Sequence, residues 1–272
     1  MPDIKIAIAG CAGRMGHMLM RQVAETEGCA LAGGFERDGA PEIGMDLGEL
    51  AGLGTLGIDV GDDPEMAFAG ADVVIDFTIP DASVANAARA AATGTALVIG
   101  TTGLDDDQAA ALRSHAAGAP IVWAPNMSPA VTLLADLVQR AAAALDQDYD
   151  IEVLEMHHRH KIDAPSGTAL ALGRAAAAGR GVDLDTVADR GRDGQTGARR
   201  RGDIGFAVLR GGGVVGDHSV LFASPNEVIE LSHRAGDRAL FAAGAMTAAK
   251  WVVGRAPGLY GLRDVLGLSA QT

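Results

Sequence analysis

The stretch IKIAIAGCAGRMGHMLMRQVAETE, residues 4–27, decides the fold class of this 272-residue chain. Residues 4–9 form an apolar run with the length of a β-strand. Residues 14–27 repeat apolar side chains at the spacing of one helical face: Met15, Met18, Leu19 and Val23. Three glycines lie in the turn between these two segments and in the first residues of the second one: Gly10, Gly13 and Gly16. A strand, a glycine turn and a helix in this order predict the first unit of a parallel α/β sheet.

Further apolar runs continue this pattern through the first half of the chain. They are ALAGGF (30–35), DVVIDF (72–77), ALVIGT (96–101) and PIVWAP (120–125). Alanine-rich helical segments lie between the later runs, at residues 82–92 and 105–117. Strands that are apolar throughout and alternate with helices indicate a parallel sheet with both faces covered. We therefore predict an α/β protein whose N-terminal part is a Rossmann-like, doubly wound parallel sheet.

The pattern changes after Ser128. We expect a long helix over residues 128–146, an alternating strand over residues 150–158, and a helix that ends near residue 178. Three later segments are expected to be consecutive antiparallel strands: residues 204–210, 214–224 and 226–235. A last helix is predicted over residues 238–254.

Two domains are predicted from this change of pattern. Residues 1–128 and 238–272 form the first domain, because the last helix is expected to return to the first sheet. Residues 129–237 form the second domain, which is smaller and of the α+β class with a mixed open sheet. A chain of this length can bury a core in each domain.

The composition limits the classes of partner. The chain has 22 Lys and Arg against 35 Asp and Glu, and the resulting formal net charge of −13 argues against nucleic acid as a main partner. The N-terminus lacks a basic segment followed by an apolar one, so we expect no signal peptide. No uncharged apolar run reaches about 18 residues, so we expect no membrane span. The two cysteines, Cys11 and Cys29, do not indicate a disulfide framework, and a cytoplasmic protein is expected.

The glycine turn and the end of the second strand indicate a dinucleotide site. Glycines let the backbone approach a pyrophosphate, whose charge the helix N-terminus and Arg14 would offset. Glu36 lies 20 positions after Gly16, where a carboxylate can bind ribose hydroxyls. Arg37 beside it could instead receive a 2′-phosphate or stack on adenine, so the pair predicts the use of both NADH and NADPH, or a modest preference for one of them. The alternative is a glycine turn kept for packing, with Ala12 in place of the usual second glycine and Glu36 merely solvated.

Three later strand ends extend this candidate site. Three groups of residues lie at the ends of apolar runs: Phe77, the segment Gly100–Thr102 and the segment Ala124–Met127. Ligands of open parallel sheets bind at the carboxyl ends of the strands, so we expect these residues to lie around a nicotinamide. An ordinary strand-to-helix turn is the alternative for each one taken alone.

A cationic segment, HHRHK at residues 157–161, precedes a Pro-Ser-Gly-Thr turn in this acidic chain. A metal site is disfavoured, because Arg159 and Lys161 would repel a divalent cation, and we expect no metal. Ordinary surface residues after a strand are a second interpretation. We favour a third, an anion site in which histidine and lysine neutralise carboxylates and supply protons. The amide and hydroxyl groups of Ser166–Thr168, at a helix start, would then hold a carboxylate.

A series of motifs occurs in order over nearly the whole chain: GCAGRMG, IDFT, IGTTG, APNMS, EMHHRHKIDAPSGTAL, RGGGVVGDHSV and ELSHRA. The sequence resembles dihydrodipicolinate reductases, also called 4-hydroxy-tetrahydrodipicolinate reductases, and HHRHKIDAPSGTA is the most specific part of the resemblance. The resemblance implies an NAD(P)H-dependent oxidoreductase of the diaminopimelate route to lysine. Its substrate would be 4-hydroxy-tetrahydrodipicolinate, a small cyclic imine dicarboxylate, and its product tetrahydrodipicolinate. The resemblance also implies a homotetramer assembled through the sheet of the second domain.

The resemblance assigns roles by position. The cofactor residues that it implies, together with those inferred above, are Gly10, Cys11, Ala12, Gly13, Arg14, Met15, Gly16, Glu36, Arg37, Phe77, Gly100, Thr101, Thr102, Ala124, Pro125, Asn126 and Met127. His157 and Lys161 match the two proton donors of the family, so they are the predicted catalytic residues. The predicted substrate contacts are His158, Lys161, Ser166, Gly167 and Thr168. Met127, where many relatives have an aromatic residue, and Arg234, where lysine is common, depart from the family pattern.

Two other functions are compatible with the nucleotide site alone. A reductase of an aldehyde or semialdehyde on the same scaffold would be favoured by a nucleophilic cysteine in the second half, and the sequence has none there. A nucleotide-sensing module without chemistry would be favoured by the loss of His157 or Lys161, and both are present. The sequence therefore favours the reductase that the resemblance implies.

Overall fold

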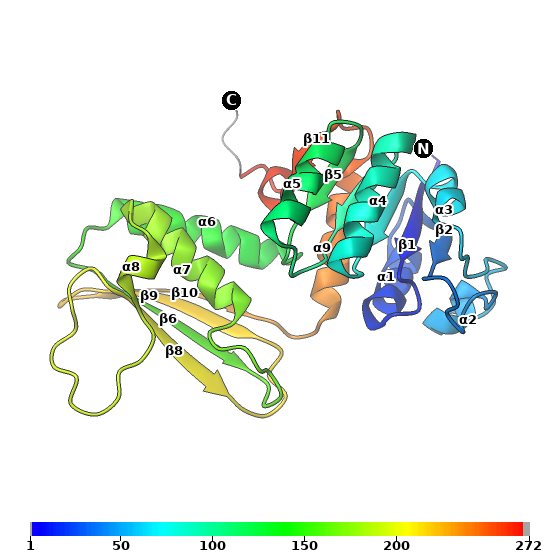
Figure 1. Ribbon diagram of the computed structural model, residues 1–272. Coiled ribbons are helices and arrows are strands. Elements are labelled where there is room, and N and C mark those ends of the chain that lie inside the picture. Colours follow the sequence, from blue (N-terminus) through cyan, green and yellow to red (C-terminus); the bar gives the residue numbers. More distant parts are fainter. Residues whose placement is uncertain (1, 269–272) are drawn as a thin grey trace. The chain divides into compact units, whose positions relative to one another are not determined.

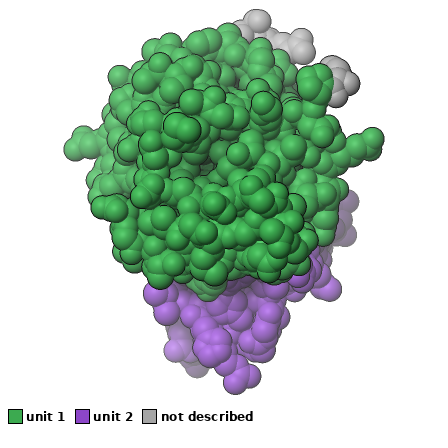
Figure 2. Space-filling view, turned by 90° about the vertical axis from the view of Figure 1, so that its right-hand side faces the viewer, with its two compact units in different colours: residues 1–128, 239–272 green, residues 129–238 purple. Residues whose placement is uncertain are grey.

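The computed structural model describes residues 2–268, which divide into two compact units. Unit 1 is made of the described residues up to Ser128 and from Ala239 onward, and unit 2 is made of Pro129–Arg238 (Figures 1 and 2). The chain therefore leaves unit 1 once and returns to it once. Each unit has its own β-sheet and its own apolar core.

Unit 1 is built on a six-stranded sheet whose order is β11-β5-β4-β3-β1-β2. The strands are β1 (Ile4–Ala9), β2 (Cys29–Phe35), β3 (Val73–Asp76), β4 (Ala96–Ile99), β5 (Pro120–Trp123) and β11 (Gly258–Tyr260). All pairings between these neighbours are parallel. The chain winds from β1 to β2 on one side and from β3 to β5 on the other, which confirms the predicted doubly wound, Rossmann-like sheet.

Helices cover both faces of this sheet (Figure 1). They are α1 (Arg14–Glu25), α2 (Leu47–Ala51), α3 (Pro64–Gly70), α4 (Pro80–Thr93), α5 (Asp106–His115), α9 (Ala239–Val252) and α10 (Leu262–Val265). One core contains Ile8 of β1 with Leu19 of α1 and Met246 of α9. The core on the opposite face contains Ala9 of β1 with Leu112 of α5. Successive residues of a strand thus serve different cores, which is why these strands are apolar at almost every position.

The segment between β2 and β3 contains α2 and α3, which the sequence patterns did not predict. Asp46 organises the loop around α2. Its carboxylate accepts backbone N–H groups from both ends of the loop, those of Gly48, Glu49, Leu56, Gly57 and Ile58. These hydrogen bonds, that of Leu56 first, lower the pKa of Asp46 to about 2. The segment has no clear hydrophobic period because one side chain, rather than a core, holds its shape.

Unit 2 consists of a five-stranded sheet and three helices among the described residues. The strands are β6 (Asp150–His157), β7 (Ala188–Asp189), β8 (Ile204–Arg210), β9 (Asp217–Ala223) and β10 (Val228–Arg234). The helices are α6 (Pro129–Ala144), α7 (Gly167–Arg180) and α8 (Leu184–Val187). The sheet order is β10-β9-β6-β8-β7, with β6 antiparallel to β9 and parallel to β8, so the predicted mixed open sheet is confirmed.

The expectation of three consecutive antiparallel strands is wrong for the first pair. β9 and β10 are antiparallel neighbours, but β6 lies between β8 and β9. The residues after β8 bond to the chain that leaves β6: the Gly211 N–H donates to the His157 carbonyl, and the Arg159 N–H to the Gly212 carbonyl. The connection therefore crosses the end of β6 instead of folding into a hairpin. Alternation along a strand fixes its two faces but not its neighbours.

Helices α6 and α7 pack on one face of this sheet. Leu134 and Leu172 of these helices belong to one core with Val153 and Phe222 of the strands. Buried and half-buried residues alternate along β6. Its four buried residues share the helix face: Ile151, Val153, Glu155 and His157. Two of these four are ionisable, so the apolar core gives way to a polar cluster at this end of β6.

Candidate functional site

The glycine turn of unit 1 has the shape of an anion cradle. Gly10 has a φ of 68°, which glycine adopts without strain. A Cβ at Gly16 would lie 2.3 Å from the carbonyl oxygen of Cys11. α1 begins after Gly13, which offers no side-chain cap, so the first N–H groups of this 12-residue helix can serve another acceptor. These observations fit the pyrophosphate of a dinucleotide.

Glu36 lies against this turn. Its Oε1 accepts the N–H of Ala12 over 2.9 Å, which holds the carboxylate at the end of β2. The side chain of Arg37 is exposed beside it. This arrangement fits the ribose of a dinucleotide bound at the turn. Cys11 is buried, and burial followed by the charge of Glu36 raises the pKa of its thiol to about 12, so Cys11 is a neutral packed side chain.

A buried polar network joins the carboxyl ends of β3 and β4. The Asp76 carboxylate accepts the hydroxyl of Thr78 over 2.6 Å and the side-chain amide of Asn86 over 2.9 Å. Thr101 Oγ1 accepts the hydroxyl of Ser83 over 2.7 Å. The predicted cofactor residue Thr101 is only 4% exposed, and its hydroxyl belongs to this network.

The other predicted cofactor residues at these strand ends differ in exposure. Thr102 and Pro125 are exposed, whereas Met127 is buried in the core of unit 1. A Cβ at Gly100 would lie 2.2 Å from the ring of Phe77, so only a glycine at this position leaves room for that ring. Met127 therefore packs as a core side chain in this structure.

His157, the last residue of β6, is paired with Glu155 on the same face of the strand. His157 Nδ1 lies 2.6 Å from Glu155 Oε2, and the two residues are 8% and 1% exposed. An ionised carboxylate can only accept, so Nδ1 carries the proton of this bond. Nε2 is then the ring atom that can exchange a proton with a substrate. A Cβ at Gly216 would lie 3.0 Å from Nε2, so the glycine keeps space beside this atom.

Glu155 is the centre of a buried polar cluster. Arg210, at the end of β8, binds its two carboxylate oxygens over 2.7 and 2.9 Å, and the Ser166 N–H donates to it over 2.9 Å. Burial opposes ionisation of Glu155, but the hydrogen bonds from Arg210, His157 and Ser166 outweigh it and lower the pKa of Glu155. The bond to Glu155 in turn raises the pKa of Arg210. Glu155 is therefore a buried anion whose charge is matched.

His218 of β9 is the aromatic neighbour of His157. The two rings meet edge to face with their centroids 5.0 Å apart, and His218 Nε2 lies 3.2 Å from Ser166 Oγ. Burial, followed by the charge of His157, lowers the pKa of His218 to about 4. His218 is therefore neutral near pH 7 and adds no charge to the cluster.

The start of α7 borders the same cluster. Ser166 caps the helix, because its Oγ accepts the N–H of Ala169 over 3.1 Å. The Ser166 side chain is buried and makes its hydrogen bonds within the protein, whereas Gly167 is exposed. The amides of Gly167 and Thr168 lie in the first turn, at the positive end of a 14-residue helix. This end of α7 suits a carboxylate ligand.

The loop after β6 carries the remaining predicted residues. Lys161 Nζ is 2.9 Å from Asp163 Oδ1, and this bond lowers the pKa of Asp163. Arg210 also binds the carbonyl of Asp163 over 2.6 Å, which ties the loop to the cluster. His158 Nε2 lies 3.5 Å from the guanidinium of Arg238, and burial, followed by the charge of Arg238, lowers the pKa of His158.

Comparison with known proteins agrees with this geometry. Two family profiles match the chain: "Dihydrodipicolinate reductase, N-terminus" over residues 4–127 and "Dihydrodipicolinate reductase, C-terminus" over residues 130–266. The chain belongs to the dihydrodipicolinate reductase family. The predicted resemblance is confirmed, and membership makes the chain an oxidoreductase whose cofactor is a nicotinamide dinucleotide.

Individual relatives match this chain over nearly its whole length. The chain is 55% identical over 269 residues to the 4-hydroxy-tetrahydrodipicolinate reductase of Rhodopseudomonas palustris (strain BisB5), covering 99% of both chains. It is 58% identical over 263 residues to that of Ruegeria pomeroyi, covering 97% of this chain and 98% of the relative. The solved dipicolinate-bound dihydrodipicolinate reductase from Paenisporosarcina sp. TG-14 superposes with a TM-score of 0.77 at 27% identity, covering 96% of this chain and 99% of that one.

Three ionisable residues of the cluster were missed by the sequence analysis of this family member: Glu155, Arg210 and His218. A signal for Glu155 is present, because it falls on the buried side of an alternating strand. A carboxylate at such a position needs donors to hold its charge. Nothing local identifies Arg210 or His218 as those neighbours, because they come from β8 and β9 and depend on the order of the strands.

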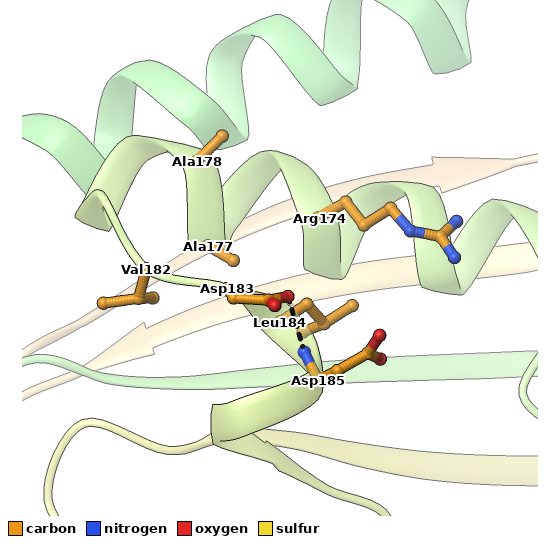
Figure 3. Close-up of a pocket in the computed structure, with 7 residues that line it drawn as sticks. All are labelled: Arg174, Ala177, Ala178, Val182, Asp183, Leu184 and Asp185. Carbon is orange, nitrogen blue, oxygen red and sulfur yellow. Dashed lines mark hydrogen bonds between the residues drawn. The ribbon is translucent and has the colours of Figure 1, made fainter.

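The basic run Arg199–Arg201 is neutralised within unit 2. Arg199 pairs with Asp150 over 2.9 Å and Arg200 with Asp203 over 2.7 Å, and Arg201 pairs with Asp148. A pocket between α7 and α8 has seven lining residues, among them Arg174 and Asp183 (Figure 3). None of the seven belongs to the predicted site of the dihydrodipicolinate reductase family.

No helix within residues 2–268 has both the length and the hydropathy needed to cross a bilayer. The same residues contain no group of three or more His, Cys, Asp or Glu side chains placed to hold a metal ion.

Proposed function

We propose that this enzyme reduces 4-hydroxy-tetrahydrodipicolinate to tetrahydrodipicolinate in the diaminopimelate route to lysine. The observation that supports this proposal most is the polar cluster around Glu155, together with the start of α7 that borders it. It combines a proton donor, His157 bound to Glu155, with a cation and helix amides suited to a dicarboxylate. The relatives from R. palustris and R. pomeroyi are 4-hydroxy-tetrahydrodipicolinate reductases, and the solved relative has dipicolinate bound.

The substrate carboxylates would be held from two sides. The first-turn amides of α7, at Gly167 and Thr168, and the side chain of His158 would bind one carboxylate. Lys161 would exchange its partner Asp163 for the substrate, since the Asp163 side chain is 53% exposed and the pair is weakly held. Both groups carry positive potential, so they also favour the negative charge that develops on the reduced ring.

Proton transfer would run through His157. When bound, the reduced nicotinamide supplies a hydride. His157 Nε2 donates the matching proton to the substrate, and Glu155 stabilises the imidazolium that exists before this transfer. The hydroxyl leaves as water together with a proton from the adjacent ring carbon, and the hydride and the proton from His157 then add across the double bond that this elimination forms. Lys161 would help to steer this proton, as the family resemblance implies.

Both nicotinamide cofactors are expected to work. Glu36, fixed by the Ala12 N–H, can accept the ribose hydroxyls of NADH. Arg37 is exposed beside it and can pair with the 2′-phosphate of NADPH. Neither residue alone dominates, so we expect a modest preference only.

Chemistry through a cysteine is disfavoured. Both cysteines, Cys11 and Cys29, belong to unit 1 and none to unit 2. Burial followed by the charge of Glu36 keeps the Cys11 thiol neutral. The cluster beside α7 therefore has no thiolate for attack on a semialdehyde.

We also propose that the enzyme is a homotetramer and is located in the cytoplasm. The face of the unit 2 sheet opposite α6 and α7 carries Leu209 and Val228, which are 49% and 58% exposed in the single chain. Exposed apolar residues on this face support association through the sheet. Sedimentation equilibrium of the full chain tests it: a monomeric mass would contradict the tetramer.

The deciding experiment follows oxidation of NADH and NADPH while pyruvate, aspartate semialdehyde and dihydrodipicolinate synthase generate the unstable substrate in place. Oxidation that requires the synthase is expected. Lys161→Ala should lower turnover by on the order of 100-fold or more and leave NADH affinity unchanged. No oxidation by protein that binds NADH would overturn the proposed substrate. Equal loss of turnover and of NADH affinity in the variant would overturn the division of roles between the units.

A further inference from the structure

We propose that Glu155 is a positioning residue of this reaction, which sets the tautomer of His157 and links it to the start of α7. The proposal rests on the proposed function, because it takes His157 Nε2 as the proton donor. Glu155 is 1% exposed and acts through its neighbours rather than on the substrate.

The first step of the argument concerns the tautomer. A neutral histidine can carry its proton on either ring nitrogen. The 2.6 Å contact between His157 Nδ1 and the Glu155 carboxylate, both buried, admits only the form with a proton on Nδ1. Nε2 is therefore an acceptor in neutral His157 and a donor in the imidazolium. The atom that faces Gly216 is thus always the one that exchanges the proton.

The second step concerns the carboxylate's other acceptor site. Glu155 Oε1 accepts the N–H of Ser166, the cap of α7, over 2.9 Å. One rigid group therefore fixes both the proton donor and the helix end that is proposed to hold the substrate. Hydride and proton transfer require such alignment, because small displacements of reacting groups cost much of the rate.

The third step concerns charge. Arg210 binds both oxygens of Glu155, so the buried anion does not repel a dicarboxylate. Around His157 the ionisable neighbours are Glu155 on its own strand, Arg210 of β8, which binds Glu155, His218 on β9, and His158, the next residue of the chain. Removal of the Glu155 charge would leave Arg210 uncompensated near His157 and disfavour its imidazolium.

The test compares Glu155→Gln with Glu152→Gln. Glu152 is a matched control, because it lies on the same strand, on the opposite face, and is bound to Arg192 and Arg199. We expect Glu155→Gln to lower kcat on the order of 10- to 100-fold with KM changed less than about threefold. The high-pH limb of its kcat profile should move to lower pH, because the neighbouring negative charge is lost. Glu152→Gln should retain the kcat and the pH profile of the wild type.

Three outcomes would overturn the positioning role: an unchanged kcat, an unchanged pH profile, or a loss confined to KM. A second measurement uses the wild-type enzyme and so does not depend on whether a variant folds. Ring nitrogen-15 NMR of the wild-type enzyme should show neutral His157 protonated on Nδ1, and a proton on Nε2 would refute the tautomer. His157→Gln in the coupled assay separates the two proposals. Full turnover in that variant would refute His157 as the donor, even if the NMR shows the expected Nδ1 proton.

Discussion

Lys161 Nζ lies 2.9 Å from Asp163 Oδ1, so the second predicted proton donor is held by a carboxylate of its own loop. The side chains of Lys161 and Asp163 are 22% and 53% exposed. A pair this exposed contributes little to stability, so a substrate carboxylate can take the place of Asp163.

Asp163→Asn should therefore lower the KM for the dicarboxylate. The competing pair is worth at most about 1 kcal/mol, which corresponds to a change of up to about fivefold in KM, and kcat should stay within about twofold. The coupled assay measures both constants. Asp185→Asn removes the same charge at a side chain that is 81% exposed and should change neither constant. A rise in KM would show that Asp163 orients Lys161 rather than competing for it.

Acid should destabilise unit 2 through His218. Its pKa in the folded chain is about 4. An exposed histidine has a pKa of about 6.5, so between these values the unfolded chain binds a proton that the folded chain does not. The contribution of neutral His218 is complete above about pH 6.5 and is lost as the pH falls toward 4, by at most about 3 kcal/mol.

His218→Gln should flatten this dependence. His158 and His233, whose pKa values burial also lowers, act in the same direction, so part of the dependence should remain. Urea unfolding midpoints of wild type and variant at about pH 7 and about pH 5 provide the measurement. The same loss of stability in both proteins would contradict the assignment to His218.

Gly16→Ala should weaken NADH binding at least about tenfold, or about 1.4 kcal/mol. The new Cβ would lie 2.3 Å from the Cys11 carbonyl oxygen and 2.4 Å from that of Gly10, so the turn must open. Gly33→Ala is the matched control, since its Cβ would meet Ala7 at an ordinary 3.9 Å. NADH fluorescence titration compares the two. Equal affinities would show that the turn does not cradle the cofactor.

Arg37→Ala should separate the two cofactors. The loss of a guanidinium–phosphate pair should lower kcat/KM with NADPH about tenfold or more and leave kcat/KM with NADH within about twofold. Arg113→Ala, which removes an exposed arginine in the last turn of α5, controls for net charge. A parallel decline with both cofactors would mean that Arg37 stacks on adenine instead.

The sequence predicted unit 1 well where burial is two-sided. The run 4–9 coincides with β1, because Ile8 and Ala9 enter cores on opposite faces and every residue of the strand except the exposed Lys5 is apolar. The helices between β2 and β3 were not predicted. Asp46 holds this segment through hydrogen bonds to its backbone, so the segment does not need a hydrophobic period that a sequence pattern could reveal.

The cluster in unit 2 was predicted in part for a related reason. His157, Lys161 and Ser166 are close in sequence, so their density was visible. Arg210 and His218 meet Glu155 only because β6 lies between β8 and β9. The order of the strands depends on how the connection 211–216 crosses the end of β6. No local sequence pattern predicts that crossing.

The interrupted path of the chain through unit 1 has a consequence for biosynthesis. α9 and β11 come after residue 238, yet α9 packs on β3, β4 and β5, and β11 pairs with β5. A nascent chain therefore exposes the apolar face beneath α9 while all of unit 2 is still being synthesised. Unit 2 is continuous, so it can finish folding while the earlier half waits. Ribosome-bound chains that stop before Ala239 should consequently depend on chaperones and aggregate once released.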